Sequence, residues 1–438
     1  MSQWLADVTL WLTANPEWLG LAIALIACLE CLAIAGILVP GTLLLFAVAV
    51  LAGNGALSLG QTLALAYAGG VLGDLLSYAT GRYFHQDIRR LPGLRHHPEW
   101  MMGAEFYFQR YGIASLLVGR FIGPLRPMLP MIAGMLNMPV GRFVLVSLLA
   151  SAGWAIAYLL PGWATGAALR LPLPTGFWPQ AAVLAAGLAA LLLLSVHESL
   201  GERRRASWIA AGLSLLLLFG LFLGWQRLDQ LDRGLLALVQ EQRSAGLDSL
   251  MVLITRLGDF HSQLAVAALL CLLLLLARQW RATLFAGGAL LATALVNSAL
   301  KALLARQRPE VLLEPLNSFS LPSGHSSAAF AFFLVLGVLA GRGQPARLRL
   351  AWLLLASLPA MTIALSRVYL GVHWPSDIIA GALLAGGLCA LSLSLTQWPT
   401  PLPALPAKVW WLILPACLGL LGAIATWQLS EALLLYRY

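Results

Sequence analysis

The chain has 438 residues, of which 60% are hydrophobic and 10% are charged. Soluble domains carry roughly 25% charged residues, so this composition excludes an ordinary soluble domain and predicts an all-α protein that crosses a membrane several times. The formal net charge is +9, but the arginines form short clusters between apolar runs, without the interleaved aromatic residues of a nucleic-acid-binding surface. We therefore expect no nucleic-acid partner and expect the positive charge to set the membrane topology.

The first apolar region, residues 19–54, contains the sequence GILVPG at 36–41 and is expected to fold as a hairpin with its tip there. The run at 60–80 that follows is long enough to cross a bilayer. Arg82, the first basic residue of the chain, places the end of this run on the cytoplasmic side, so the hairpin would enter from outside. Because no positive segment precedes the first apolar residues, no cleaved signal peptide is expected.

The second apolar region, residues 111–140, is interrupted by Pro124, Pro127 and Pro130. We expect no helix to run through these prolines. The flanking residues Arg110 and Arg142 both belong on the cytoplasmic side, which predicts a hairpin that enters and leaves there, followed by a span at 143–165. A hairpin and a span, present twice in opposite orientations, predict an N-terminal inverted repeat with two re-entrant hairpins, as in many transporters.

Ionisable residues of this first half are expected at membrane depth: Glu30, Asp74, Arg120 and Arg126. Charged groups there are costly and mark functional sites, which makes these four candidate transport residues. The alternative is that Glu30 pairs with an arginine and holds the hairpins together, a structural role that is common for buried pairs. Both roles are compatible.

The first half resembles the DedA family, whose wider superfamily is named for SNARE-associated Golgi proteins. The resemblance covers about residues 20–166 and is carried by Glu30, Val39 to Gly41, Gly73 to Arg82, Gly119 to Gly134, Gly153-Trp154 and Pro161-Gly162. It implies re-entrant hairpins and, in several members, movement of polyprenyl phosphates or phospholipids across the bilayer. Many members carry an acidic residue after the Pro-Gly where this chain has Thr42, so no proton-coupling role is carried over to that position.

The polar segment HESLGERRRA, residues 197–206, is the expected cytoplasmic linker between a domain at 1–196 and a domain at 207–396. Further apolar runs long enough to be spans lie at 179–196, 207–225, 262–277, 282–303, 325–341, 350–366, 376–396 and 409–427. The arginine clusters between them alternate properly if all face the cytoplasm. We therefore predict a C-terminal six-helix bundle, with one extra transmembrane helix in 397–438.

Three polar constellations lie at span ends on the predicted outer face of this bundle: KALLARQRP at 301–309, PSGH at 322–325 and SRVYLGVHWPSD at 366–377. The cations Lys301, Arg308 and Arg367 can converge only if an anion compensates them, and phosphate fits best. Ser323 is a good N-cap, and Gly324 lets a ligand approach the backbone N–H groups of a helix start, which bind anions. These five residues are the predicted phosphate-binding set.

Two histidines lie in the same constellations. Pro375 suits the first turn of a helix, which places Asp377 close to His373, able to fix its tautomer and raise its basicity. We therefore predict His373 as the nucleophile, with a phosphohistidine intermediate, and His325 as the general acid. A zinc site of His325, His373 and Asp377 is disfavoured by the neighbouring cations and by the lack of an HExxH spacing, so no metal or other cofactor is expected.

These residues resemble the three signature motifs of the type 2 phosphatidic acid phosphatase superfamily. The matching positions are Lys301, Arg308, Pro309, Pro322, Ser323, Gly324, His325, Ser366, Arg367, His373 and Asp377. The resemblance covers about residues 207–396 and implies six spans and metal-independent phosphatase chemistry with the roles given above. Soluble haloperoxidases share the motifs, but the apolar spans exclude that branch.

Together these features predict a bacterial inner-membrane fusion of a lipid phosphatase, facing the periplasm, with a lipid-phosphate transporter. The phosphatase would convert undecaprenyl pyrophosphate to undecaprenyl phosphate, and the first half would return the product inward. Alternatives are a phosphatidic acid or phosphatidylglycerophosphate substrate, and a first half that is a scaffold without transport. Membrane lipids are the expected partners, and no oligomeric state is predicted.

Overall fold

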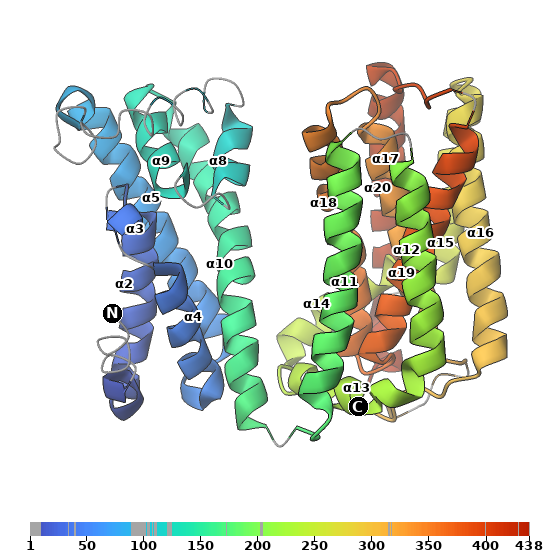
Figure 1. Ribbon diagram of the computed structural model, residues 1–438, viewed down its shortest axis with the longest axis horizontal. Coiled ribbons are helices and arrows are strands. Elements are labelled where there is room, and N and C mark those ends of the chain that lie inside the picture. The colour runs from blue at the N-terminus through green and yellow to red at the C-terminus, as the bar shows by residue number, and fades with distance from the viewer. Residues whose placement is uncertain are drawn as a thin grey trace. The chain divides into compact units, whose positions relative to one another are not determined.

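The computed structural model describes residues 10–33, 35–38, 41–88, 102, 106, 108, 112–120, 125–171, 173–201, 205–313, 316, 318–398, 400–427 and 429–437. The regular elements in these ranges are all helices, and the chain separates into two compact units, Met1–Leu173 and Pro174–Tyr438 (Figure 1). Within the described ranges, eight helices are long and apolar enough to cross a membrane, and a bent pair adds a ninth. The protein is therefore an all-helical, multi-span membrane protein.

The first unit is built from long helices joined through short ones. They are η1 (Pro16–Trp18), α2 (Leu19–Cys31), α3 (Ala35–Leu38), α4 (Gly41–Leu51), η2 (Ala52–Ala56), α5 (Leu59–Ile88), α8 (Ile113–Gly119), α9 (Leu125–Met135) and α10 (Val140–Arg170). α2 and α9 both pack on α5, and α4 packs on α10. Buried Tyr78, Met128, Ile132 and Phe143 form much of the apolar core around α5, α9 and α10.

Glycines on α5 allow close contacts with two neighbouring helices of this unit. A Cβ atom at Gly73 would collide with the Cys28 carbonyl of α2, and one at Gly81 would collide with the Met131 carbonyl of α9. Backbones that approach through glycine gain van der Waals contact without apolar driving force, as membrane helices require. α5 is thereby held between the two hairpin regions.

The prediction that no helix runs through the prolines of the second hairpin is wrong for two of them, because α9 includes Pro127 and Pro130. Pro127 lies in the first helical turn, where the N–H groups have no partner in the helix, so its missing donor costs little. Pro130 removes one intrahelical hydrogen bond without ending the helix. Pro124 and the hairpin tip at Val39 and Pro40 lie outside the described residues, and the re-entrant course of both hairpins stays a prediction.

The second unit is a helical bundle around α17. Its elements are α11 (Phe177–Leu200), α12 (Ala206–Gly224), η3 (Trp225–Leu228), α13 (Asp229–Gln240), α14 (Ala245–Arg256), α15 (Phe260–Leu276), α16 (Trp280–Leu304), α17 (Gly324–Ala340), α18 (Ala346–Tyr369), α19 (Pro375–Thr396), α20 (Ala407–Thr426) and α21 (Leu429–Leu435). α17 packs against α16, α18 and α19, and most of its side chains are buried. The start of α17 therefore lies among the ends of α16 and α18 and the start of α19.

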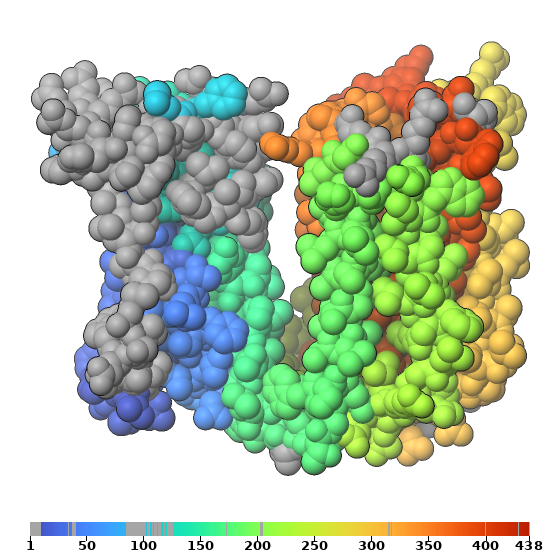
Figure 2. All heavy atoms as spheres, in the orientation of Figure 1, coloured from blue at the N-terminus to red at the C-terminus, as the bar shows by residue number. Residues whose placement is uncertain are grey.

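The compact units divide between Leu173 and Pro174, whereas the sequence analysis grouped residues 174–196 with the first half. α11 packs against α12 and α13, and Figure 2 shows α11 and α12 side by side on one face of the second unit. A helix with apolar residues on all sides gives no signal in the sequence of which neighbour it will contact. The functional border at 197–206 stays a prediction.

Each predicted span lies largely within a helix, with two qualifications. α15 is bent by 44° from α14, and α17 is shorter than the helices that satisfy the length criterion for a span. The sequence analysis did not anticipate α13 and α14, because polar residues interrupt both and neither is a continuous apolar run. These short helices border the candidate site.

Candidate active site

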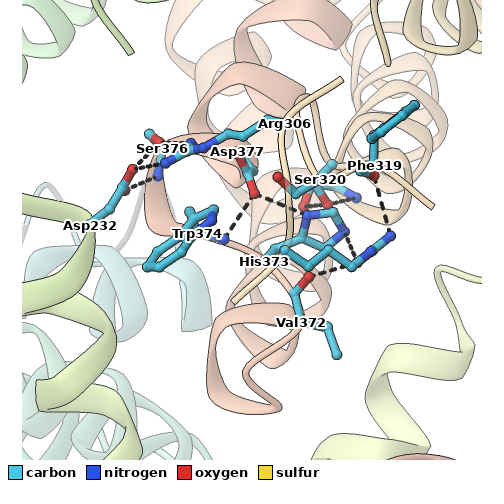
Figure 3. Close-up of polar contacts among 12 residues, drawn as sticks. Asp232, Arg306, Phe319, Ser320, Val372, His373, Trp374, Ser376 and Asp377 are labelled. Carbon is cyan, nitrogen blue, oxygen red and sulfur yellow. Dashed lines mark hydrogen bonds and ion pairs between the residues drawn. The ribbon is translucent and has the colours of Figure 1, made fainter. Parts of the chain in front are cut away.

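His373 lies in the short loop between α18 and α19 and is almost fully buried. Its Nδ1 atom is 3.2 Å from Oδ2 of Asp377, in the first turn of α19, and the same oxygen accepts the Trp374 N–H at 2.9 Å (Figure 3). Pro375 begins α19, as the sequence predicts, because its fixed φ suits the first turn. Asp377 therefore caps its own helix and orients His373.

The partners of His373 define its tautomer. Nη1 of Arg308 lies 3.1 Å from His373 Nε2, and a guanidinium group can only donate, so Nε2 is the acceptor. Nδ1 then carries the proton and donates it toward the Asp377 carboxylate. The lone pair of Nε2 consequently points to the cationic side of the site, which is the arrangement that a nucleophile requires.

The electrostatic surroundings keep His373 neutral. Burial, followed by the positive charges of Arg308, Arg367 and Lys301, lowers the pKa of His373 well below its ordinary value. The predicted convergence of three cations is thus found around the imidazole. Burial also lowers the pKa of Arg308, to about 10, which still leaves this guanidinium charged at neutral pH.

Arg308 and Lys301 are held by neutral oxygen atoms of two loops, the one before α17 and the one before α19. Arg308 donates to the carbonyls of Ser318 at 2.7 Å and Val372 at 2.6 Å, and Lys301 Nζ donates to the Phe319 carbonyl at 3.0 Å. Lys301 lies in the last turn of α16, as expected. Among the described residues neither forms an ion pair with a carboxylate, so their charge is available to an anion.

Arg367 lies in the last turn of α18 and is 1% exposed. Its Nη1 donates to Thr255 Oγ1 and to Tyr436 Oη, at 2.8 Å each. Its Nε atom has no hydrogen-bond partner in the part of the chain that the structure describes. A buried guanidinium with an unused donor is costly unless a ligand completes its hydrogen bonds.

Ser323 is the N-cap of α17, as predicted, and its hydroxyl oxygen accepts the Ser326 N–H at 3.4 Å. The Ser323 N–H donates to the Asp377 carbonyl at 3.0 Å, so the starts of α17 and α19 share a backbone hydrogen bond. A Cβ atom at Gly324 would lie 4.0 Å from Lys301 Nζ. The helix start and the lysine thus face the same small region.

His325 has a carboxylate partner that its own motif does not contain. Its Nε2 atom is 2.8 Å from Oδ1 of Asp259, in the turn between α14 and α15, and the sequence analysis did not include this aspartate in the site. Gly258 makes the approach possible, because a Cβ there would lie 2.6 Å from Ile363 Cγ2 and 3.2 Å from His325 Cβ. Each of the two histidines is therefore held by an aspartate, His325 by Asp259 and His373 by Asp377.

Arg306 is a second residue that the sequence analysis missed, although it lies inside KALLARQRP. Figure 3 shows it reaching Asp377 and Asp232, with Nη1 2.9 Å from Asp377 Oδ1 and Nη2 2.7 Å from Asp232 Oδ2. Asp232 pairs with Arg306 and also accepts the Ser376 N–H at 2.8 Å. Arg306 also lies over the rings of Trp225 and Trp374. Arg306 thereby holds Asp377 through Oδ1, the carboxylate oxygen that does not contact His373.

A cavity of about 660 Å³ opens beside Lys301 and Arg308. Its lining combines Lys301 and Arg308 with apolar side chains that include Leu312, Leu316 and Phe319. A space with a cationic end and an apolar wall fits an amphiphile with an anionic headgroup.

The first unit holds a different cluster of charges. Arg126 pairs with Glu30 and Arg120 pairs with Asp74, and all four side chains are buried. The expectation that Glu30 pairs with an arginine is confirmed. Two hydroxyls also donate to the carboxylates: Thr42 Oγ1 to Glu30 Oε1 at 2.8 Å, and Ser147 Oγ to Asp74 Oδ2 at 2.6 Å, while Glu30 Oε2 has no partner among the described residues.

Aromatic rings cover the two arginines. The guanidinium groups of Arg120 and Arg126 lie 5.1 Å and 5.8 Å from the Trp154 ring, and Arg126 lies 5.6 Å from the Tyr158 ring. The pocket that Asp74, Arg120 and Arg126 help to line has about 10 Å³ of free volume. This is about the space of one water molecule.

The two units therefore define a membrane protein that combines a unit with paired buried charges and a bundle with a histidine–carboxylate site. Three cations of that site, Lys301, Arg308 and Arg367, pair with no carboxylate among the described residues. The family model described as VTT domain matches residues 39–164, and that of the PAP2 superfamily matches residues 282–401. The chain belongs to the DedA family through its VTT domain and carries a PAP2-superfamily domain in its second unit. The sequence resemblances to both are confirmed.

Relatives of the first unit include two inner membrane proteins of Escherichia coli strain K12. YabI is 34% identical over 161 residues, 37% of this chain and 63% of YabI, and YqjA is 31% identical over 157 residues, 35% of this chain and 71% of YqjA. The chain thus spans less than two thirds of the length of YabI. Among solved structures, a PAP2 type phosphatidylglycerolphosphate phosphatase from Bacillus subtilis is similar at 25% identity, a TM-score of 0.38, and coverage of 42% of this chain and 93% of the other.

Proposed function

We propose that the second unit is a metal-independent lipid phosphatase. The single observation that carries this is the Nε2 lone pair of His373, directed at Arg308 while Nδ1–H is held by Asp377. Nε2 attacks the terminal phosphorus of a lipid phosphate, and the bond from phosphorus to the leaving oxygen breaks as His325 donates a proton to that oxygen. A water molecule then hydrolyses the phosphohistidine, giving its proton to His325 and restoring His373.

Positive groups stabilise the charge that develops on the transferring phosphoryl group. Lys301, Arg308 and Arg367 supply cationic donors, and the N–H groups that follow Ser323 at the start of α17 supply neutral ones. Asp259 holds His325 in position to act as the acid, in the same way that Asp377 holds His373. No step in this scheme uses a metal ion.

The proposed substrate is undecaprenyl pyrophosphate, and the product is undecaprenyl phosphate. The apolar wall beside Lys301 and Arg308 supports a lipid rather than a soluble phosphate ester. A glycerolipid phosphate, either phosphatidic acid or phosphatidylglycerophosphate, is the alternative, because apolar walls do not specify chain length. The site is proposed to face the periplasm, since the arginines between spans favour the cytoplasm.

The first unit is proposed to move the monophosphate product back across the bilayer. Arg120 and Arg126 could exchange their carboxylate partners for a lipid phosphate, and the buried pairs Glu30–Arg126 and Asp74–Arg120 support this possibility. The competing proposal is a scaffold in which the same pairs only hold helices together. The two activities would form one recycling sequence at the inner membrane.

The decisive experiment is phosphate release by the purified protein from a panel of lipid phosphates in excess chelator. Release that persists without divalent metal and is inhibited by vanadate supports the mechanism, whereas loss in chelator with recovery on adding zinc or magnesium contradicts it. The substrate with the highest kcat/KM decides between the polyprenyl and glycerolipid alternatives.

Orientation is tested separately in intact cells. A cysteine at Leu312, in the loop bordering the site, should react with a membrane-impermeant thiol reagent, and a cysteine at Gln344, in the turn before α18, should not. The reverse pattern would place the site on the cytoplasmic side.

A further inference from the structure

The end of the chain reaches the candidate active site, although it lies beyond the PAP2 match at 282–401. α21 is followed by Tyr436, which is 7% exposed. Its hydroxyl oxygen accepts a hydrogen bond from Arg367 Nη1 at 2.8 Å, and its ring lies 5.6 Å from the Arg367 guanidinium. A residue outside the PAP2-matched region therefore contacts one of the proposed phosphate-binding cations.

Apolar packing and a backbone hydrogen bond hold this segment against the site. Ala432 and Tyr436 belong to one buried cluster with Val252, Leu370 and Val372, and the last two lie in the loop that carries His373. The Arg437 carbonyl accepts the Leu313 N–H at 3.1 Å. α21 packs against α14, and Figure 1 shows the C-terminal end at the same end of the bundle as α13.

Two hydroxyls fix the same end of Arg367. Nη1 bonds both Thr255 Oγ1 and Tyr436 Oη, while Nε has no partner among the described residues. Because the guanidinium is planar and rigid, holding Nη1 sets the direction of its remaining N–H groups. The free N–H groups of Arg367 are then oriented toward an acceptor other than Thr255 and Tyr436.

We propose that Tyr436 is a positioning residue of the phosphate site, which holds Arg367 in the orientation that binds the transferring phosphoryl group. This inference rests on the proposed phosphatase function. It means that the C-terminal segment 429–437 completes a site whose other parts come from α14 and from α16 to α19. Tyr436 acts through Arg367 and takes no part in the chemical step.

The first test is Tyr436→Phe, which removes the hydroxyl and keeps the ring. Loss of a hydrogen bond to a charged group should lower kcat/KM for phosphate release about tenfold and weaken orthovanadate binding by a similar factor. Vanadate binding is measured as the rise in the thermal unfolding temperature of the full chain with vanadate concentration. Glu431→Gln, at an exposed position of α21, is the matched control and should leave both values unchanged.

The second test asks whether the effect passes through Arg367. In an Arg367→Lys background, Tyr436→Phe should change vanadate binding less than about twofold, because coupled residues are not additive. Additive effects, wild-type binding by Tyr436→Phe alone, or increased activity of that variant would each overturn the proposal. If the wild-type protein released no phosphate from any lipid phosphate, the phosphatase function would fail, while vanadate binding would still decide the role of Tyr436.

Discussion

Both units hold cationic side chains at their candidate functional residues, but the two sets differ in whether a carboxylate pairs with them. In the first unit Arg120 and Arg126 each pair with a carboxylate, and the free space beside them is about that of one water molecule. In the second unit Lys301, Arg308 and Arg367 bond carbonyls and hydroxyls and form no ion pair with a described carboxylate. An anion can bind the second site as it stands, whereas binding in the first requires an existing ion pair to open.

The largest expected effect removes the nucleophile. His373→Ala should reduce phosphate release by at least about 10⁴-fold, because no other group can form the covalent intermediate. Inorganic phosphate released from the best lipid substrate measures this, with transport of supplied monophosphate in proteoliposomes as the control. Retention of the wild-type rate would remove His373 from the mechanism and with it the contrast between the units.

The second-largest effect is expected from a substitution that breaks an ion pair of the first unit. Arg126→Ala leaves Glu30 buried and unpaired, which should destabilise the unit by about 3–5 kcal/mol, seen as a lower thermal unfolding temperature. Phosphate release in detergent should stay near the wild-type rate. Combining Arg126→Ala with Glu30→Gln should recover much of the stability.

Transport by that double variant distinguishes the two roles of the pair. A transporter that uses the pair should stay inactive in proteoliposomes even when stability is recovered, and undecaprenyl phosphate should accumulate on the outer leaflet in cells. Transport never detectable with the wild-type protein would leave the scaffold as the role of the first unit.

A third effect concerns the aspartate that holds the general acid. Asp259→Asn should reduce turnover of a lipid alkoxide leaving group by about 10²-fold, within the range of general acid catalysis. Turnover of an aryl phosphate, whose leaving group needs little protonation, should fall much less. Equal losses with both leaving groups would mean that Asp259 supports folding rather than the acid.

The smallest effect is a shift in pH dependence. Burial and nearby cations lower the pKa of His373, so its neutral form persists as the pH falls and the acid limb of kcat/KM should lie below the ordinary histidine value of about 6.5. Arg308→Gln removes a positive charge that lowers this pKa, so the acid limb should move to higher pH. An unchanged or lower limb in the variant would show that Arg308 does not act on the nucleophile.

Whether the partners of a site residue are near or distant in the sequence explains which contacts could be predicted from the sequence. His373 and Asp377 are four residues apart at a helix start, and Ser323 caps its own helix, so local geometry sufficed for both. Asp259 is 66 residues from His325, and Asp232 is 74 residues from Arg306. No periodicity or motif links such pairs, because only the packing of separate helices brings them together.

The error at the prolines of the second hairpin and the unforeseen packing of α11 have physical reasons of the same kind. α9 accommodates Pro127 because the first turn needs no donor there, a position that can be recognised only once the helix start is known. α11 is apolar around its whole circumference, so its sequence does not indicate that it packs against α12 and α13. Ionisable residues inside the apolar regions, such as Glu30 and Arg126, could be singled out because each requires a partner or a ligand there. Arg306, Asp232 and Asp259 lie in more polar segments, where a charge carries no such signal.

The hydrogen bond from the Ser323 N–H to the Asp377 carbonyl joins the starts of α17 and α19. Because His325 follows one end of this bond and His373 precedes the other, the bond couples the positions of the two histidines and, in the proposed mechanism, helps to keep the spacing of acid and nucleophile. Arg308 is tied to the same part of the site through the Val372 carbonyl and His373 Nε2. Lys301 is bonded instead to the Phe319 carbonyl, so of these two cations it is the one whose position depends on the loop before α17 alone.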